Sequence, residues 1–234
     1  MSTTWKEYNK IFKTSYSELV RSAVEAIGKI SLLLGPSAVY EKMNDIIGWL
    51  VTLLKKKAPC QVKRESFDEE TSEEDYIMLQ SVLDTLQELT KSLGSLIVPH
   101  LAGIFNTFSP YVMIPTSESC DYILSTIAEI ATEIEDDIAP FAGPFLDIST
   151  KAMIPDEDDA VILNACRCAR EMIYFAPDVC KPKASSLLSS IKMLFTGDYS
   201  NRPLASGAVA GLIAQVSISY PDLLPLDQVL ESFL

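Results

Sequence analysis

Apolar residues recur every third or fourth position along most of the chain. The clearest stripes run through Leu79, Val82, Leu86, Leu89, Leu93, Ile123, Ile127, Ile130 and Ile134. This spacing places apolar side chains on one face of an α-helix. The alternating pattern of a half-buried strand is almost absent. The chain is therefore predicted to be all-α.

The same pattern gives the extent of each predicted helix. A first helix ends near residues 5–12, and a last one begins after Pro225. Between them the predicted helices span 15–35, 39–57, 75–97, 99–112, 117–138, 141–153, 157–176, 183–196 and 201–219.

Prolines mark the corners between these helices at nearly constant intervals. Pro99, Pro140, Pro182 and Pro225 follow one another by 41, 42 and 43 residues. Proline is tolerated in the first turn of a helix and cannot continue the preceding one. A period of ~40–47 residues with two helices in each unit is typical of HEAT and armadillo repeats. Because each helix pair buries only one face by itself, we expect antiparallel pairs stacked into a solenoid.

One segment breaks the period. Leu34 and Leu93 hold equivalent places but lie 59 residues apart instead of 41, which leaves 18 extra residues. The extra stretch is rich in charge and poor in large apolar side chains, which is typical of a flexible loop. We therefore expect HEAT repeats over 1–57, an acidic flexible loop inserted within a repeat at 58–74, and HEAT repeats over 75–234 with the last one truncated. The chain would then be a fragment of a longer protein.

The charge balance restricts the partners. The chain carries 32 acidic and 19 basic residues, for a net charge of −13. This excess argues against direct binding of nucleic acid, which needs a basic surface. It suits a basic protein partner, although from charge alone solubility is the more ordinary explanation. No apolar run reaches the ~18 residues that a membrane span needs, so we expect no membrane partner.

Candidate chemistry is sparse. The five cysteines include no CxxC pair, and His100 is the only histidine. His100 follows a corner proline, in a place that Phe141, Lys183 and Leu226 fill in other repeats, so we expect a structural role for it. The sequence has no nucleophile elbow, phosphate loop, dinucleotide fingerprint or HExxH motif. We predict no enzyme activity, no cofactor and no metal site.

Acidic side chains are the remaining candidates for a functional surface. They gather in the inserted loop and on the predicted helix at 117–138, where they would attract a basic partner. A solvated surface with no partner is the alternative. The candidate acids are Glu65, Asp68, Glu69, Glu70, Glu73, Glu74, Asp75, Glu129, Glu133 and Asp136.

Several segments resemble one family. They include "LVRSAVEAIGKI" at 19–30, the acidic loop with its following helix at 68–112, and "PLDQVLESFL" at 225–234. Together they resemble the late HEAT repeats of importin-beta-type nuclear transport receptors, the karyopherin beta family. Within that family the importin 4 branch is the nearest in pattern, followed by the importin 5 branch.

The resemblance implies a right-handed superhelix that carries cargo proteins through the nuclear pore. It further implies that the GTPase Ran controls release, that nucleoporins bind the full-length receptor, and that the protein moves between cytoplasm and nucleus. Because that family binds Ran chiefly through its N-terminal repeats, the resemblance assigns no residue of this chain to Ran binding. The alternative is a HEAT-repeat scaffold subunit of another complex, of the phosphatase or chromosome-organising type.

Overall fold

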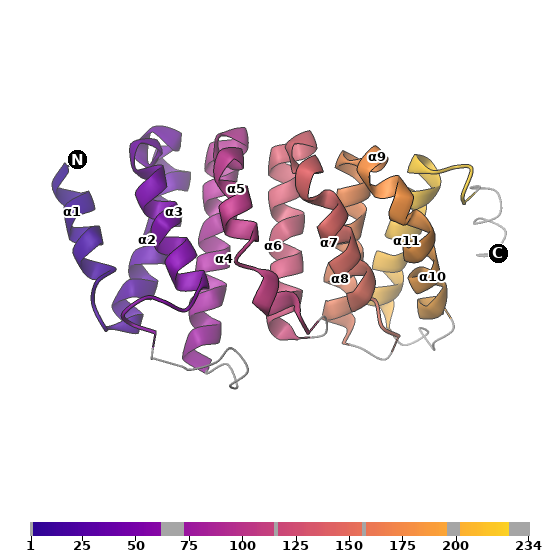
Figure 1. The fold of residues 1–234 in the computed structure, drawn as a ribbon, viewed down its shortest axis with the longest axis horizontal. Helices are drawn as coiled ribbons and strands as arrows, with labels where there is room; N and C mark the ends of the chain where they lie inside the picture. Colours follow the sequence, from indigo (N-terminus) through magenta and orange to yellow (C-terminus); the bar gives the residue numbers. More distant parts are fainter. Residues whose placement is uncertain (1, 62–72, 115–116, 156–157, 196–201, 225–234) are drawn as a thin grey trace. The chain divides into compact units, whose positions relative to one another are not determined.

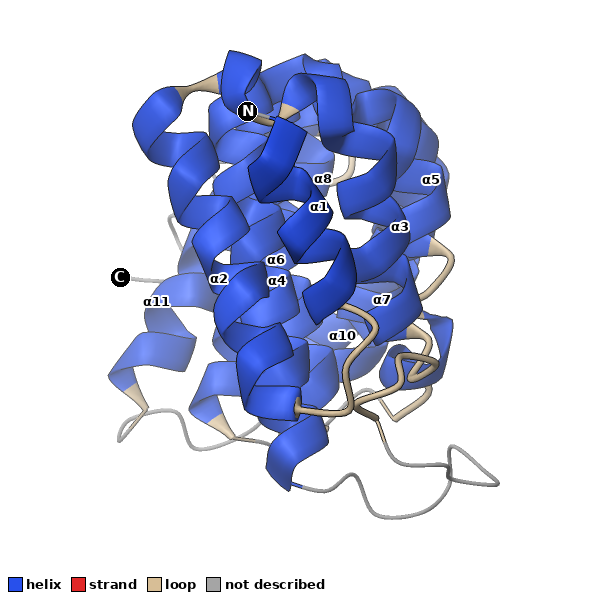
Figure 2. Cartoon of the chain, turned by 90° about the vertical axis from the view of Figure 1, so that its left-hand side faces the viewer, coloured by secondary structure: helices blue, strands red, loops and turns tan. Residues whose placement is uncertain are grey.

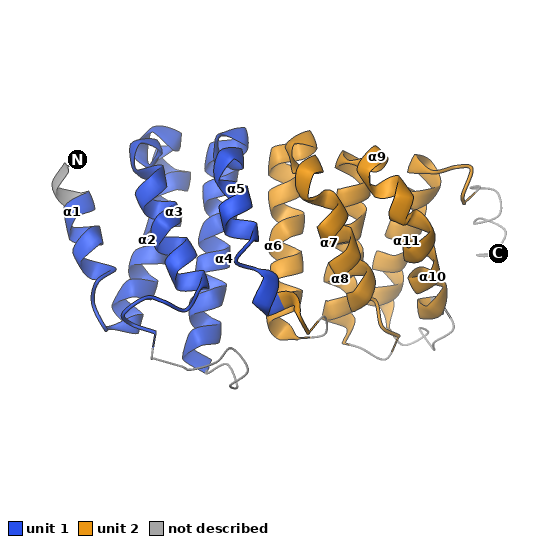
Figure 3. Ribbon diagram, in the orientation of Figure 1, with its two compact units in different colours: residues 1–111 blue, residues 112–234 orange. Residues whose placement is uncertain are grey.

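The computed structural model describes residues 2–61, 73–114, 117–155, 158–195 and 202–224. Helices and the turns that join them make up these ranges, and no residue within them lies in a strand (Figure 2). The all-α prediction is therefore confirmed. The chain divides into two compact units, Met1–Tyr111 and Val112–Leu234 (Figure 3).

Unit 1 is built on two long helices that lie side by side (Figure 1). Its helices are α1 (Ser2–Ile11), α2 (Ser17–Leu34), α3 (Met43–Leu54), α4 (Glu73–Leu93) and α5 (Val98–Phe105), with short 3-10 turns at Pro36–Ala38, Tyr40–Lys42, Gly94–Ile97 and Ser109–Val112. Helices α2 and α4 pack along their lengths, α3 packs on α4, and α5 packs on α3. The apolar stripe through Val82, Leu86 and Leu89 is fully buried, as its spacing predicts.

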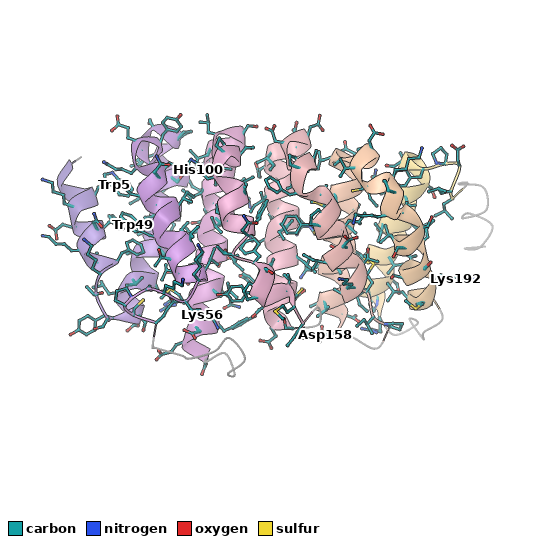
Figure 4. The ribbon with its side chains drawn as sticks, in the orientation of Figure 1. Trp5, Trp49, Lys56, His100, Asp158 and Lys192 are labelled. Atoms are coloured by element: carbon teal, nitrogen blue, oxygen red, sulfur yellow. The ribbon has the colours of Figure 1, made fainter. Side chains whose placement is uncertain are left out.

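Aromatic side chains attach α1 to the rest of unit 1. Phe12 follows α1 and stacks on Trp49 of α3, with ring centroids 4.4 Å apart. Trp5 lies 6.5 Å from the same indole (Figure 4). Such pairs add about 0.5–1.5 kcal/mol beyond the area that they bury.

Unit 2 is arranged around α8. Its helices are α6 (Glu118–Ile134), α7 (Ala139–Ala152), α8 (Asp159–Phe175), α9 (Pro177–Cys180), α10 (Ala184–Phe195) and α11 (Pro203–Ser219), with 3-10 turns at Glu135–Ile138 and Lys181–Lys183. Helix α8 packs against α6, α7 and α11. Ala165 and Ala169 are fully buried on α8. Small side chains on this helix allow its neighbours to approach closely.

Three of the side-chain hydrogen bonds in unit 2 join residues at the same spacing. Asn164 donates to Asp121, Arg202 donates to Asp159, and the Tyr220 hydroxyl donates to the Pro177 carbonyl. The two residues of each pair are 43 positions apart. Equivalent places in successive helix pairs are therefore in contact.

Unit 1 has the same spacing with an insertion. Thr85 donates to the Val24 carbonyl and Ser92 to the Ser31 carbonyl, and both bonds join residues 61 positions apart. The difference from 43 is 18 residues, the excess that the sequence assigns to the inserted segment.

Two kinds of corner end the long helices. Gly35 after α2 has φ 77°, Gly94 after α4 has φ 53°, and Glu135 after α6 has φ 51°. The chain turns through a positive φ at all three corners, although one of them has no glycine. The ends of α8 and α11 instead meet a proline, at Ala176–Pro177 and Tyr220–Pro221.

Several helix bounds differ from the prediction. Helix α4 begins at Glu73, two residues earlier than predicted, and its last predicted turn is the 3-10 segment Gly94–Ile97. Pro144 lies inside α7, and the predicted corner before α10 contains the short helix α9. Ala58 and Cys60, at the start of the predicted loop, are buried. The rest of that loop up to residue 72, and the helix predicted after Pro225, lie outside the described residues.

Candidate functional site

Polar contacts join α2 to α4 in unit 1. Ser81 donates to the Glu25 carboxylate at 2.9 Å. Glu88 of α4 lies over Gly28 of α2, so closely that an added Cβ would lie 2.0 Å from a Glu88 carboxylate oxygen. Burial raises the pKa of Glu88, and the nearby Lys29 partly opposes this rise. The absence of a side chain at Gly28 is what lets the carboxylate lie between the helices.

Polar contacts also join α6 to α8 in unit 2. Asn164 donates to Asp121 at 2.8 Å, and Arg167 forms an ion pair with Glu129. Burial raises the pKa of Asp121, and the hydrogen bond from Asn164 counteracts part of that rise. Side chains of α8 therefore donate hydrogen bonds to the acidic side chains on this face of α6.

The described candidate acids fall into two groups. Glu73, Glu74 and Asp75 form the first turn of α4 in unit 1, where negative charge complements the helix dipole. In unit 2, Glu129 and Glu133 lie half-buried on α6, and Asp136 is exposed in the turn that follows. The remaining candidates, Glu65, Asp68, Glu69 and Glu70, lie outside the described residues.

Two arginines on α8 form ion pairs with acids that the sequence pattern does not predict. Arg167 pairs with Glu129, and Arg170 pairs with Glu171. A spacing of 38 residues between Arg167 and Glu129 gives no local signal of their pairing. The 43-residue helix period would have brought these positions within a few residues of one another. Of the three acids predicted in unit 2, Glu129 is thus already engaged within the chain.

The cysteines are buried and free. Burial raises the pKa of Cys120, Cys166 and Cys168 to about 12, and that of Cys180 to about 11. The thiolate is the reactive form of cysteine, and these values leave very little of it at neutral pH. None of these four thiols is therefore activated as a nucleophile.

His100 lies in the first turn of α5, after Pro99 (Figure 4). Within the described ranges, no group of three or more His, Cys, Asp or Glu residues is placed to hold a metal ion. Within the same ranges, no helix combines the length and the apolar character needed to cross a membrane.

Comparison with known proteins does not identify a family for this chain. No protein-family model matches the chain, and no curated protein matches it at a significant level.

Proposed function

We propose that this chain is a HEAT-repeat fragment of a nuclear import receptor of the importin-beta type. In this proposal the helix pairs form a right-handed solenoid, the cargo is a basic protein, and Ran controls its release in the full-length receptor. Nucleoporins bind that receptor as it moves between cytoplasm and nucleus.

The repeated spacing of the inter-helix hydrogen bonds is the observation that best supports the repeat architecture. Three bonds in unit 2 join residues 43 positions apart, and this number lies within the ~40–47 residues of HEAT repeats. A HEAT solenoid has such bonds because each helix pair contacts the equivalent helices of the next pair. This spacing supports a HEAT architecture, which the scaffold alternative shares, and the sequence resemblance alone favours the receptor family.

The charge supports a basic cargo. The net charge is −13, and Glu73, Glu74, Glu133 and Asp136 form no ion pair among the described residues. A negative surface raises the local concentration of a positive partner and its association rate.

The alternative is a scaffold subunit of another complex. The ion pair between Glu129 and Arg167 favours it, because acids neutralised within the chain attract a basic cargo less strongly. A scaffold needs its helices held together and does not need those carboxylates.

Salt-dependent binding of a basic peptide tests the cargo proposal. The chain is titrated with a fluorescent lysine- and arginine-rich peptide from ~50 to ~300 mM NaCl. We expect affinity to fall steeply with salt, since exposed charges are screened beyond ~8 Å at physiological ionic strength. The variant Glu133→Lys with Asp136→Lys should bind at least about fivefold more weakly at low salt.

The matched control reverses two exposed acids in unit 1, Glu41→Lys with Asp45→Lys. Equal weakening by both variants would reduce the effect to net charge, and no binding at low salt would contradict a basic cargo. Ran loaded with GTP should release the peptide from the full-length receptor. Peptide binding that persists with Ran bound would favour the scaffold.

A further inference from the structure

A small cleft lies between the first turns of α2 and α4 in unit 1. Its volume is about 240 Å³, and it is lined by Ser17, Glu18, Arg21, Glu74, Ile77 and Met78. Clefts that hold whole small molecules usually measure ~300–1,000 Å³. The cleft is therefore of a size for one side chain and not for a cofactor.

Its walls carry more negative than positive charge. Glu18 and Glu74 are exposed, and neither forms an ion pair among the described residues. Among the described lining residues Arg21 is the one cation, and its Nη1 lies 3.7 Å from Oε1 of Glu25, which draws the guanidinium toward that carboxylate. The lining therefore carries two carboxylates against one guanidinium, which favours a cation over an anion in the cleft.

The floor of the cleft is apolar. Ile77 is half-buried and Met78 is almost completely buried, so the hydrocarbon surface of the lining comes mainly from Ile77. Lysine and arginine combine an aliphatic stem with a charged end, and they commonly lay the stem along apolar surface. A neutral or acidic side chain would lack either the apolar stem or the positive charge that this lining favours.

We propose that this cleft binds one arginine or lysine side chain of a basic partner protein. The aliphatic stem lies on Ile77 and Met78, and the charged end forms charge-assisted hydrogen bonds with Glu18 and Glu74. This inference rests on the proposed function insofar as the partner is basic. It adds a defined subsite on α2 and α4 of unit 1.

Methyl NMR of the whole chain tests the site directly. The chain is labelled with ¹³C in its Ile and Met methyl groups and titrated with N-acetyl-arginine amide. The neutral isostere N-acetyl-citrulline amide is titrated in parallel. We expect saturable shifts of the Ile77 and Met78 methyl signals with the arginine probe and none with the citrulline probe. Shifts with neither probe, or equal shifts with both, would overturn the proposal.

Two variants locate the charge requirement. Glu18→Gln with Glu74→Gln should lower the affinity for the arginine probe about tenfold. Glu41→Gln with Asp45→Asn removes the same charge from exposed positions elsewhere in unit 1 and should leave the affinity unchanged. Equal weakening by both variants would show that net charge and not the cleft binds the probe. Circular dichroism checks that both variants are folded.

The basic peptide separates this inference from the proposed function. If the peptide binds the Glu18→Gln, Glu74→Gln variant as tightly as the original chain, a basic cargo stands and the cleft proposal fails. If the peptide does not bind but the arginine probe shifts both methyl signals, the cleft stands and a basic cargo fails.

Discussion

At the scale of single residues, two tyrosine hydroxyls join distant parts of the chain. Tyr111 donates to the Leu54 carbonyl at 2.6 Å in unit 1. Tyr220 donates to the Pro177 carbonyl at 2.7 Å in unit 2. Both side chains are buried. The Leu54 carbonyl would lose this donor if the Tyr111 hydroxyl were removed, whereas the Pro177 carbonyl would still accept from the backbone N–H of Lys181.

Tyr111→Phe should lower the free energy of unfolding by about 1–2 kcal/mol, because the buried Leu54 carbonyl is left without that donor. Tyr220→Phe should cost less, about 0.5–1 kcal/mol, because the Pro177 carbonyl keeps the Lys181 N–H as a donor. Urea unfolding followed by circular dichroism measures the change. Tyr174→Phe is the control, since Tyr174 is 61% exposed and its hydroxyl is free to bond with water. A loss of stability as large in the control would contradict the role of the two hydroxyls.

The buried thiols should make the chain sensitive to alkali. Folding raises the pKa of Cys166 and Cys168 from 9.0 to about 12. Their contribution to stability is complete below pH 9 and is lost as the pH rises toward 12, because the unfolded chain releases these protons first. Each thiol can lower the unfolding free energy by at most about 1.4 kcal/mol per pH unit in that window.

The measurement compares unfolding free energies at pH 8 and pH 10. A variant with Cys166→Ala and Cys168→Ala should show a smaller decrease between these pH values, whatever its stability at pH 8. An equal decrease in both chains would mean that other groups cause the alkaline effect.

At the scale of elements, the corners after α2, α4 and α6 share one backbone requirement, a positive φ. Gly94 meets a positive φ without strain because it has no Cβ. Glu135 holds φ 51° and ψ −125° at the corresponding corner after α6. Side-chain-bearing residues in sparsely populated backbone regions cost about 1–3 kcal/mol.

Glu135→Gly should therefore stabilise unit 2 by about 1 kcal/mol, since the relief of strain exceeds the added flexibility of the unfolded chain. The opposite change, Gly94→Ala, should destabilise unit 1 by about the same amount. Thermal unfolding measures both. Glu133→Gly is the control, because it places glycine within helix α6 and should destabilise by ~1 kcal/mol. If Glu135→Gly were destabilising like this control, strain at the corner would be excluded.

The elements were more predictable from sequence than the contacts between them. Stripes such as Leu79 to Leu93 give helices directly, because their period is set by helix geometry. Corner prolines locate the ends to within a few residues. The pairing of Arg167 with Glu129 was not predicted, since it depends on how neighbouring helices are placed and not on a local pattern. The positive φ at Glu135 was not predicted either, because the usual sequence sign of a positive φ is a glycine, and this corner has none.

At the scale of the whole chain, the excess of acids opposes folding. With a net charge of −13, the acidic side chains repel one another more strongly in the compact folded state than in the extended unfolded chain. Local ion pairs such as Lys183 with Asp147 offset only a part of this repulsion.

Added salt should therefore stabilise the chain at pH 7. Raising NaCl from ~10 to ~150 mM should increase the melting temperature by ~2–4 °C, because screening weakens the repulsion. The same change near pH 4.5, the isoelectric point, should have little effect. Salt that lowers the melting temperature at pH 7 would show that attractive pairs outweigh the excess charge.

The 43-residue spacing that three hydrogen bonds in unit 2 share has a mechanical consequence. Under tension along the chain, each bond ties one helix pair to the next, so the pairs detach one after another. Each detachment frees the same number of residues, and 43 residues extend to ~150 Å when stretched. A force–extension curve of this unit would then rise and drop in equal steps, and the length of a step would measure the repeat.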